Sequence, residues 1–339
     1  MQSTRRYSIG AIIRWQKKVL LILLVLVSIP VLLYSFFGWE WLKLPWQPIG
    51  LIGIAVSFYL GFKNNSSYDR LWEGRKIWGG IVNASRSFTV MARDFVETPE
   101  AKGVLNTEER HNVQKSLVHR HVAWLYALSF QMRKPKKWEH FKEQDENFRV
   151  YADTNYEEEK FTRLKPYLSE EEYEYLMTKG NKASHLLSLQ SKHIMALRNE
   201  GFIDGFLHQQ LQGMITEFYT LMGKSERIKN FPFPRQYAGI NLYFVFLFVF
   251  LIPFGMLSLF SGPDDHWIWL SIPFSFISGW VFITMEMIGD YSENPFEGLY
   301  NDVPILNISR GIEIDIRQML EEVDLPAPTQ PVGDMKILV

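Results

Sequence analysis

The run IGLIGIAVSFYLGF carries bulky apolar side chains at intervals of four residues, at Ile54, Phe58 and Phe62. In a helix this spacing places the three side chains on one face. Small residues recur beside them at the same interval, at Gly53, Ser57 and Gly61. Small residues let a neighbouring helix approach closely. The two stripes suit a helix that packs beside copies of itself and forms a hydrophobic constriction. They are also typical of an ordinary packed membrane helix.

Four apolar runs are long enough to place such a helix in a bilayer. They cover residues 19–37, 46–62, 239–262 and 267–288. A helix rises about 1.5 Å per residue, so runs of this length cross a hydrocarbon core. A soluble protein can bury one such helix, but hardly four. The sequence therefore predicts a membrane protein with four transmembrane helices.

The charges that flank these runs predict their orientation. Lysine and arginine are concentrated before the first span, after the second and before the third, whereas the two short loops between spans hold mainly acidic residues. By the positive-inside rule, both termini and the long middle segment are cytoplasmic. Tryptophans gather on the opposite side, at positions 39, 41, 46, 267 and 269. We expect a multi-pass protein of the inner (plasma) membrane.

The middle segment, residues 63–230, is charged, poor in turn signals and helical in its apolar spacing. It has no repeat or low-complexity linker, so we interpret residues 1–325 as a single unit in which membrane helices continue into a large cytoplasmic helical body. The proline-rich tail, residues 326–339, is expected to be extended or bound along a surface. The predicted fold class is an all-α membrane protein.

Motifs for catalysis are missing from the sequence. The eight histidines do not follow a metal-ligand helix pattern, and the chain carries neither a phosphate-binding glycine loop nor a GxSxG turn. The absence of cysteine excludes disulfides and thiolate metal sites. The basic run at residues 133–137 is interpreted as a solvated loop and not as a nucleic-acid site. We expect neither an enzyme nor a cofactor.

The polar continuation of the second span, residues 58–86, carries a long run of polar and aromatic residues: Lys63, Asn64, Tyr68, Arg70, Trp72, Glu73, Arg75, Trp78, Asn83, Ser85 and Arg86. This run resembles the bestrophin family in its bacterial branch. Residues 226–234 and 293–296 agree as well, so the resemblance covers about residues 5–320. It implies an ion channel that assembles as a homopentamer around one axial pore. In that family the second span lines a hydrophobic neck, and Ile54, Phe58 and Phe62 match its three rings.

The resemblance also implies a second constriction near the start of the third span, for which Phe231, Phe233 and Arg235 are the candidates. Passive transport of small inorganic ions is expected, with chloride as the family default. Phenylalanine edges favour anions and their faces favour cations. Lys63 would add to an anion preference if it faced the axis, and Asn64 and Asn65 offer donors beside the pore.

Two alternatives stay open at this stage. One is a cation-selective (sodium or potassium) channel of the same architecture, and the other is a membrane scaffold or sensor without a pore. The expected partners are copies of the chain itself, the bilayer and inorganic ions.

Animal members of the family carry a calcium clasp on an Asn-Pro-Phe run followed by aspartates. Here residues 294–296 repeat the run but the aspartates do not follow, so a cap-and-turn role is favoured over a metal site. Weak calcium candidates are Asp290, Glu293, Glu297 and Asp302. Glu286, inside the fourth span, is predicted to pair with Arg70 or Arg75.

Overall fold

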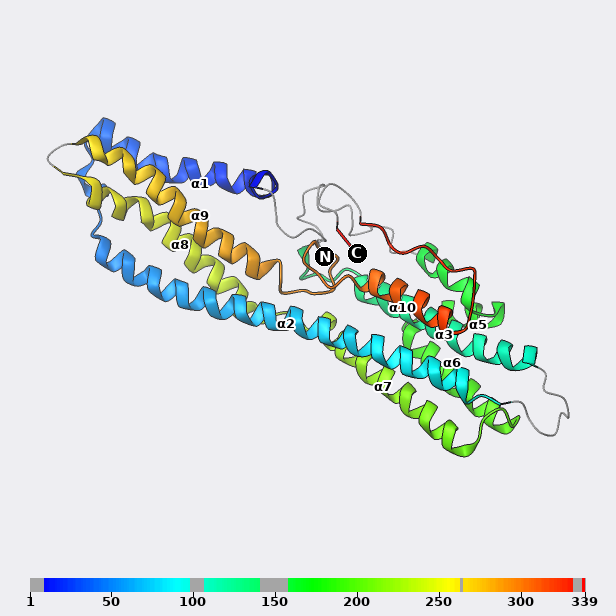
Figure 1. Cartoon of the computed structure of the whole chain (residues 1–339). Coiled ribbons are helices and arrows are strands. Elements are labelled where there is room, and N and C mark those ends of the chain that lie inside the picture. Colours follow the sequence, from blue (N-terminus) through cyan, green and yellow to red (C-terminus); the bar gives the residue numbers. More distant parts are fainter. Residues whose placement is uncertain (1–8, 98–106, 141–157, 263–264, 332–336, 339) are drawn as a thin grey trace. The chain divides into compact units, whose positions relative to one another are not determined.

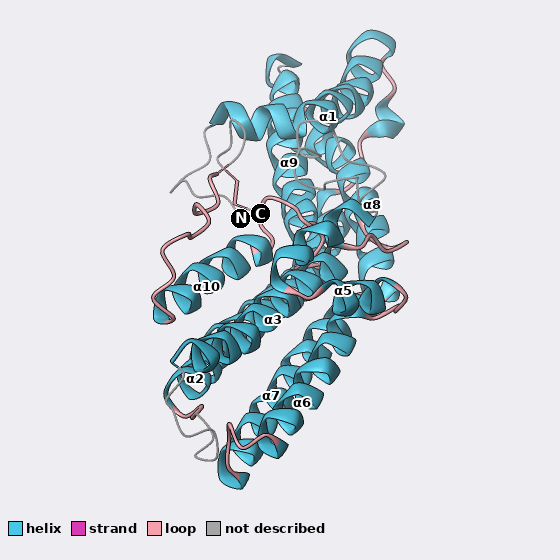
Figure 2. Ribbon diagram, turned by 90° about the vertical axis from the view of Figure 1, so that its right-hand side faces the viewer, coloured by secondary structure: helices cyan, strands magenta, loops and turns pink. Residues whose placement is uncertain are grey.

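The computed structural model describes residues 9–97, 107–140, 158–262, 265–331 and 337–338. In this part of the chain the structure consists of helices joined by loops (Figures 1 and 2). The all-α fold class predicted from the sequence is confirmed. Contacts divide the chain into two compact units. The membrane unit comprises the described parts of residues 4–70 and 232–293, and the body unit comprises those of residues 71–231 and 294–339.

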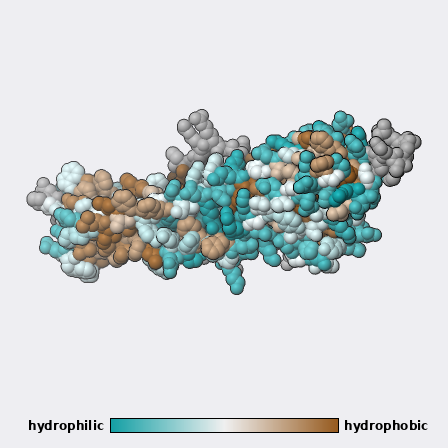
Figure 3. Space-filling view, turned by 90° about the horizontal axis from the view of Figure 1, so that it is seen from below, coloured by the Kyte–Doolittle hydropathy of each residue, from teal (hydrophilic) through white to brown (hydrophobic). Residues whose placement is uncertain are grey.

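Four long helices build the membrane unit. They are α1 (Ile9–Phe37), the first half of α2 (Trp46–Asp94), α8 (Arg235–Phe260) and α9 (Ser271–Asp290), and the short helices η1 (Glu40–Leu42) and η5 (Asp265–Leu270) lie in its two loops. Each long segment is long and apolar enough to cross a membrane. Apolar surface gathers over this unit, whereas the body unit is largely hydrophilic (Figure 3). The outward apolar surface suits a lipid environment.

Two helices are longer than the apolar runs that identified them. Helix α1 begins at Ile9, ten residues before the predicted span, and α2 continues to Asp94 without a break. No proline follows Pro48 within α2, so nothing in this stretch removes a backbone donor from the helical ladder. Helix α2 therefore runs from the membrane unit into the body unit as one element.

The body unit is built around a buried aromatic cluster. Its helices are the end of α2, α3 (Thr107–Arg133), η4 (Glu158–Tyr167), α5 (Glu170–Met177), α6 (Lys182–Asn199), α7 (Gly205–Asn230) and α10 (Ile305–Met319). Trp78 and Phe88 of α2 are buried in the same core as Trp124 and Phe218. His121 stacks on Trp124 and contacts Phe218. Burial lowers the pKa of His121 to about 3, so this histidine is a neutral core residue.

Side-chain caps define where several body helices begin. Ser169 forms a capping box with Glu172 at the start of α5, and Asn181 and Asp204 cap α6 and α7. The acidic run at residues 170–172 thus forms the first turn of α5. Of the predicted tail, residues 326–331 are irregular, and most of the remainder lies outside the described residues. The grouping of residues 1–325 as one channel unit stays a prediction.

Candidate pore-lining face of helix α2

Helix α2 presents the predicted ring stripe away from the rest of its own chain. Ile54 is 57% exposed, Phe58 68% and Phe62 69%. The other side of the same helix is buried, with Val56 and Leu60 in the core of the membrane unit. The three exposed side chains span eight residues of helix, about 12 Å. Large apolar side chains on an exposed face require lipid, another protein surface or a dry pore to cover them.

The small-residue stripe beside the rings divides into two parts. Gly53 is buried, and the ring of Phe248 on α8 occupies the space where a Cβ at this position would lie. Ser57 is exposed and its hydroxyl donates to the carbonyl of Gly53 at 2.7 Å. A Cβ at Gly61 would meet no atom within 4 Å. Gly53 thus serves packing within the chain, whereas Ser57 and Gly61 leave an open strip beside the rings.

Lys63, a candidate polar residue beside the pore, was expected to favour anions if its charge faced the axis. Its side chain is buried, at 2% exposure, and its ammonium group is paired with the carboxylate of Glu286 on α9. The amide of Asn241 on α8 donates to the other oxygen of the same carboxylate. One residue step along a helix separates the directions of Phe62 and Lys63 by about 100°, so the ammonium lies away from the exposed stripe.

The same ion pair corrects the prediction for Glu286, which was expected to bind Arg70 or Arg75. Sequence reasoning also missed Asn241. The sequence signalled that a carboxylate within a span requires a partner. The structure selects Lys63, which lies seven residues after the buried Val56, on the inward side of α2. Of the polar residues that follow, Asn64 donates to the carbonyl of Met285 at 3.0 Å, whereas Asn65 is exposed.

The three candidates for a second constriction differ in their surroundings. Phe231, in the body unit, is 65% exposed. Phe233, in the membrane unit, is buried. Arg235 forms an ion pair with the buried carboxylate of Glu293 at 3.3 Å. Because a buried ring has no surface to offer a passing ion, Phe231 is the better aromatic candidate.

The weak calcium candidates are engaged by protein groups. Asp302 accepts hydrogen bonds from the backbone N–H groups of Gly298 and Leu299 at 2.6 and 2.9 Å, and Glu297 is paired with His140. Asp290 and Glu293 belong to the membrane unit, whereas Glu297 and Asp302 belong to the body unit. Among the described residues, no cluster of three or more acidic or histidine side chains is arranged to hold a metal ion.

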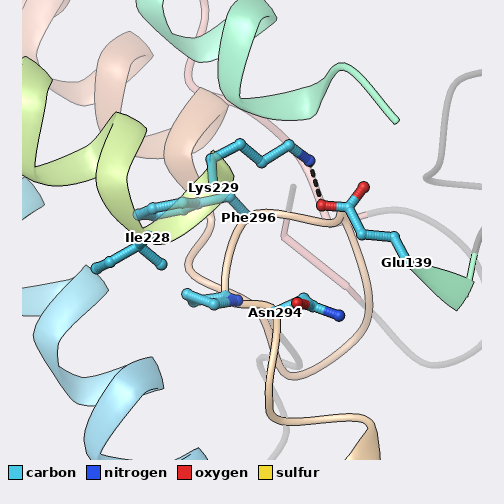
Figure 4. A pocket seen from close by; sticks show the side chains of 6 residues that line it. Glu139, Ile228, Lys229, Asn294 and Phe296 are labelled. Carbon is cyan, nitrogen blue, oxygen red and sulfur yellow. Dashed lines mark hydrogen bonds and ion pairs between the residues drawn. The ribbon is translucent and has the colours of Figure 1, made fainter. Parts of the chain in front are cut away.

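Buried charges surround the loop that carries the Asn-Pro-Phe run. Figure 4 shows the ammonium of Lys229 directed at the carboxylate of Glu139, 2.5 Å away, beside Asn294 and Phe296. Both charged side chains are buried. Burial lowers the pKa of Lys229 and raises the pKa of Glu139. The loop thus lies against a buried ion pair of the body unit.

Comparison with known proteins identifies the family. The model of the bacterial/fungal bestrophin family matches residues 7–318, and this chain belongs to that family. The voltage-dependent anion channel-forming protein YneE of Salmonella typhi is 26% identical over 316 residues, which cover 92% of this chain and 89% of that protein. The voltage-dependent anion channel-forming protein RSc3414 of Ralstonia nicotianae is 26% identical over 278 residues, covering 82% and 78%.

Solved structures agree in fold. A crystal structure of a bacterial bestrophin homolog from Klebsiella pneumoniae has a TM-score of 0.73 and 22% identity, covering 89% of this chain and 97% of that one. At this identity the likeness establishes the fold. The resemblance to bestrophins predicted from the sequence is therefore confirmed.

Proposed function

We propose that this chain is the subunit of an anion channel of the inner membrane. Five copies surround one pore, and both termini are cytoplasmic. Chloride is the expected ion, and Ile54, Phe58 and Phe62 form the neck. The observation that carries the proposal is the exposed apolar stripe on α2, opposite a face buried against the chain's own helices. The names of the curated relatives, which describe anion channel-forming proteins, support it.

The neck acts by excluding water. Five copies of each ring would leave a narrow apolar passage about 12 Å long, and such a constriction gates by dewetting. Because the charge of Lys63 is neutralised by Glu286, a preference for anions must come from elsewhere. Ring edges of Phe58 and Phe62 turned toward the axis supply it, because aromatic edges are positive.

Because Lys63 is buried, a cation-selective channel of the same architecture is the second candidate function. Without a fixed positive charge on the exposed stripe, rings that present their negative faces would favour sodium or potassium. A scaffold or sensor without a pore predicts a monomer or dimer and no ion flux.

Removal of the neck side chains tests the proposal. The triple variant Ile54→Ala, Phe58→Ala, Phe62→Ala is expected to raise single-channel conductance in planar bilayers, because it widens and wets the constriction. Ion selectivity is expected to change little. An unchanged conductance would show that these residues do not form the constriction.

The control replaces apolar side chains elsewhere on the exposed surface of the membrane unit. Leu21→Ala and Ile22→Ala on α1 remove apolar side chains that are 64% and 66% exposed. The conductance of this double variant is expected to equal that of the unmodified protein.

A further inference from the structure

Lys63 lies on the inward side of α2, which carries apolar or small residues in the preceding turns. Ile49, Val56 and Lys63 are seven residues apart, and all three are buried. Gly53, Leu60 and Ser67 form a second buried set with the same spacing. Seven-residue spacing keeps side chains on one side of a helix. The inward side of α2 is therefore uncharged as far as Leu60 and then places an ammonium group at its next position.

Three helices meet at the carboxylate that neutralises this charge. Lys63 of α2 donates to one oxygen of Glu286 on α9, and Asn241 of α8 donates to the other. All three side chains are buried. Each carboxylate oxygen thus has its own donor, which is the condition for a tolerable buried ion pair.

Close contact between α2 and α9 continues at the next residue. The amide of Asn64 donates to the carbonyl of Met285 at 3.0 Å. The side-chain oxygen of Asn64 lies in the space where a Cβ at Gly289 would be, so a larger residue there would displace the Asn64 side chain. Two successive residues of α2 are therefore held by α9, which limits both rotation and sliding of α2.

The neck ring Phe62 lies on the same helical turn but points elsewhere. Phe62 is 69% exposed and Lys63 is 2% exposed. A rotation of α2 that buries Phe62 would withdraw Lys63 from Glu286. Both charges would then be unpaired in apolar surroundings, which is strongly unfavourable. Buried polar groups fix register in other helical assemblies for the same reason.

We propose that Lys63, Glu286 and Asn241 are positioning residues of the neck: their buried network sets the rotation of α2, so that Ile54, Phe58 and Phe62 face outward from the subunit. The role assigned to the rings rests on the proposed channel function. The rotation itself is a property of the single chain and is measured without ion flux.

The natural absence of cysteine makes the rotation directly measurable. Phe62→Cys and Leu60→Cys are introduced singly, and each purified protein is labelled with a small uncharged maleimide that also enters apolar passages. Leu60 is fully buried, so the thiol at position 62 is expected to react faster than the thiol at position 60. In Lys63→Met and Glu286→Gln backgrounds this ratio of rates is expected to fall by about tenfold or more, since loss of one partner releases the docked orientation.

Two further backgrounds separate positioning from general damage. The exchange Lys63→Glu with Glu286→Lys restores opposite charges, and Asn241 can present its amide oxygen to the new ammonium group, so the ratio is expected to recover. Glu172→Gln breaks the ion pair with Arg120 in the body unit, and is expected to leave the ratio unchanged.

A neutral double variant keeps the test decisive if single variants misfold. Lys63→Met with Glu286→Met leaves neither charge unpaired, and such replacements fold well in other proteins. A reduced ratio in this variant supports the proposal. A ratio equal to that of the unmodified protein would overturn it, whether or not the neck assignment holds. Failure of the channel proposal alone would instead appear as a missing current with the labelling ratios as expected.

Discussion

At the scale of single residues, the positive charge nearest to the ring stripe in the sequence stabilises the fold and does not face the exposed stripe. Lys63, the basic residue next to the last ring, is buried in an ion pair. The exposed stripe of α2 is therefore apolar over its three rings, and Asn65 is the nearest exposed polar residue beyond it. Ion preference then depends on how the phenylalanine rings are oriented.

The two phenylalanines near the start of α8 are predicted to respond differently to truncation. Phe231→Ala removes an exposed ring and is expected to raise conductance with little loss of stability. Phe233→Ala empties a buried position and should cost about 3 kcal/mol of unfolding free energy. Bilayer recordings and thermal unfolding in detergent measure the two effects. Equal destabilisation by both variants would contradict the assignment.

Asp302 is predicted to make stability depend on pH. Burial raises its pKa to about 7 from 3.8, despite Arg133 nearby and the backbone donors of Gly298 and Leu299. Between these values the folded chain keeps a proton that the unfolded chain has released, so unfolding free energy falls as pH rises through this window. Three pKa units correspond to about 4 kcal/mol.

The variant Asp302→Asn lacks this titration. Its unfolding temperature is expected to fall less than that of the unmodified protein between pH 5 and pH 7.5. Asp315→Asn, at a half-exposed ion pair with Arg86, serves as the control and should follow the unmodified protein. Identical pH slopes for all three proteins would show that Asp302 is ionised throughout.

At the scale of elements, α2 is the central helix. It provides the ring stripe, the lysine of the buried ion pair and part of the body core. Its stripes and its polar continuation could be identified from the sequence, since both are local patterns in one helix. The partner of Glu286 could not, because Lys63 lies 223 residues away and several basic residues of α2 satisfied the same local criterion. Only the packing of α2, α8 and α9 selects among them.

The two glycines of the small-residue stripe are predicted to act at different levels. Gly53→Leu would collide with Phe248 and is expected to destabilise the subunit by about 1–3 kcal/mol. Gly61→Leu enters open space in the single chain. If copies pack along this strip, it should reduce the pentamer fraction while subunit stability is kept. Native mass spectrometry and thermal unfolding distinguish the two results. An intact pentamer in the Gly61→Leu variant would show that Gly61 does not lie in the interface between copies.

At the scale of the whole molecule, an apolar membrane unit and a hydrophilic body unit share one continuous helix. Exposed apolar residues on α1, α8 and α9 suit lipid, and the ring stripe on α2 suits a shared axis. The chain belongs to the bestrophin family, and a curated relative named as an anion channel-forming protein covers 92% of it.

The most direct test is the reversal potential of the purified protein in a planar bilayer under a KCl gradient. An anion channel predicts a reversal potential close to the chloride equilibrium potential. A value close to the potassium equilibrium potential would contradict anion selectivity and favour the cation channel. The absence of any current from purified pentamers would contradict the channel itself.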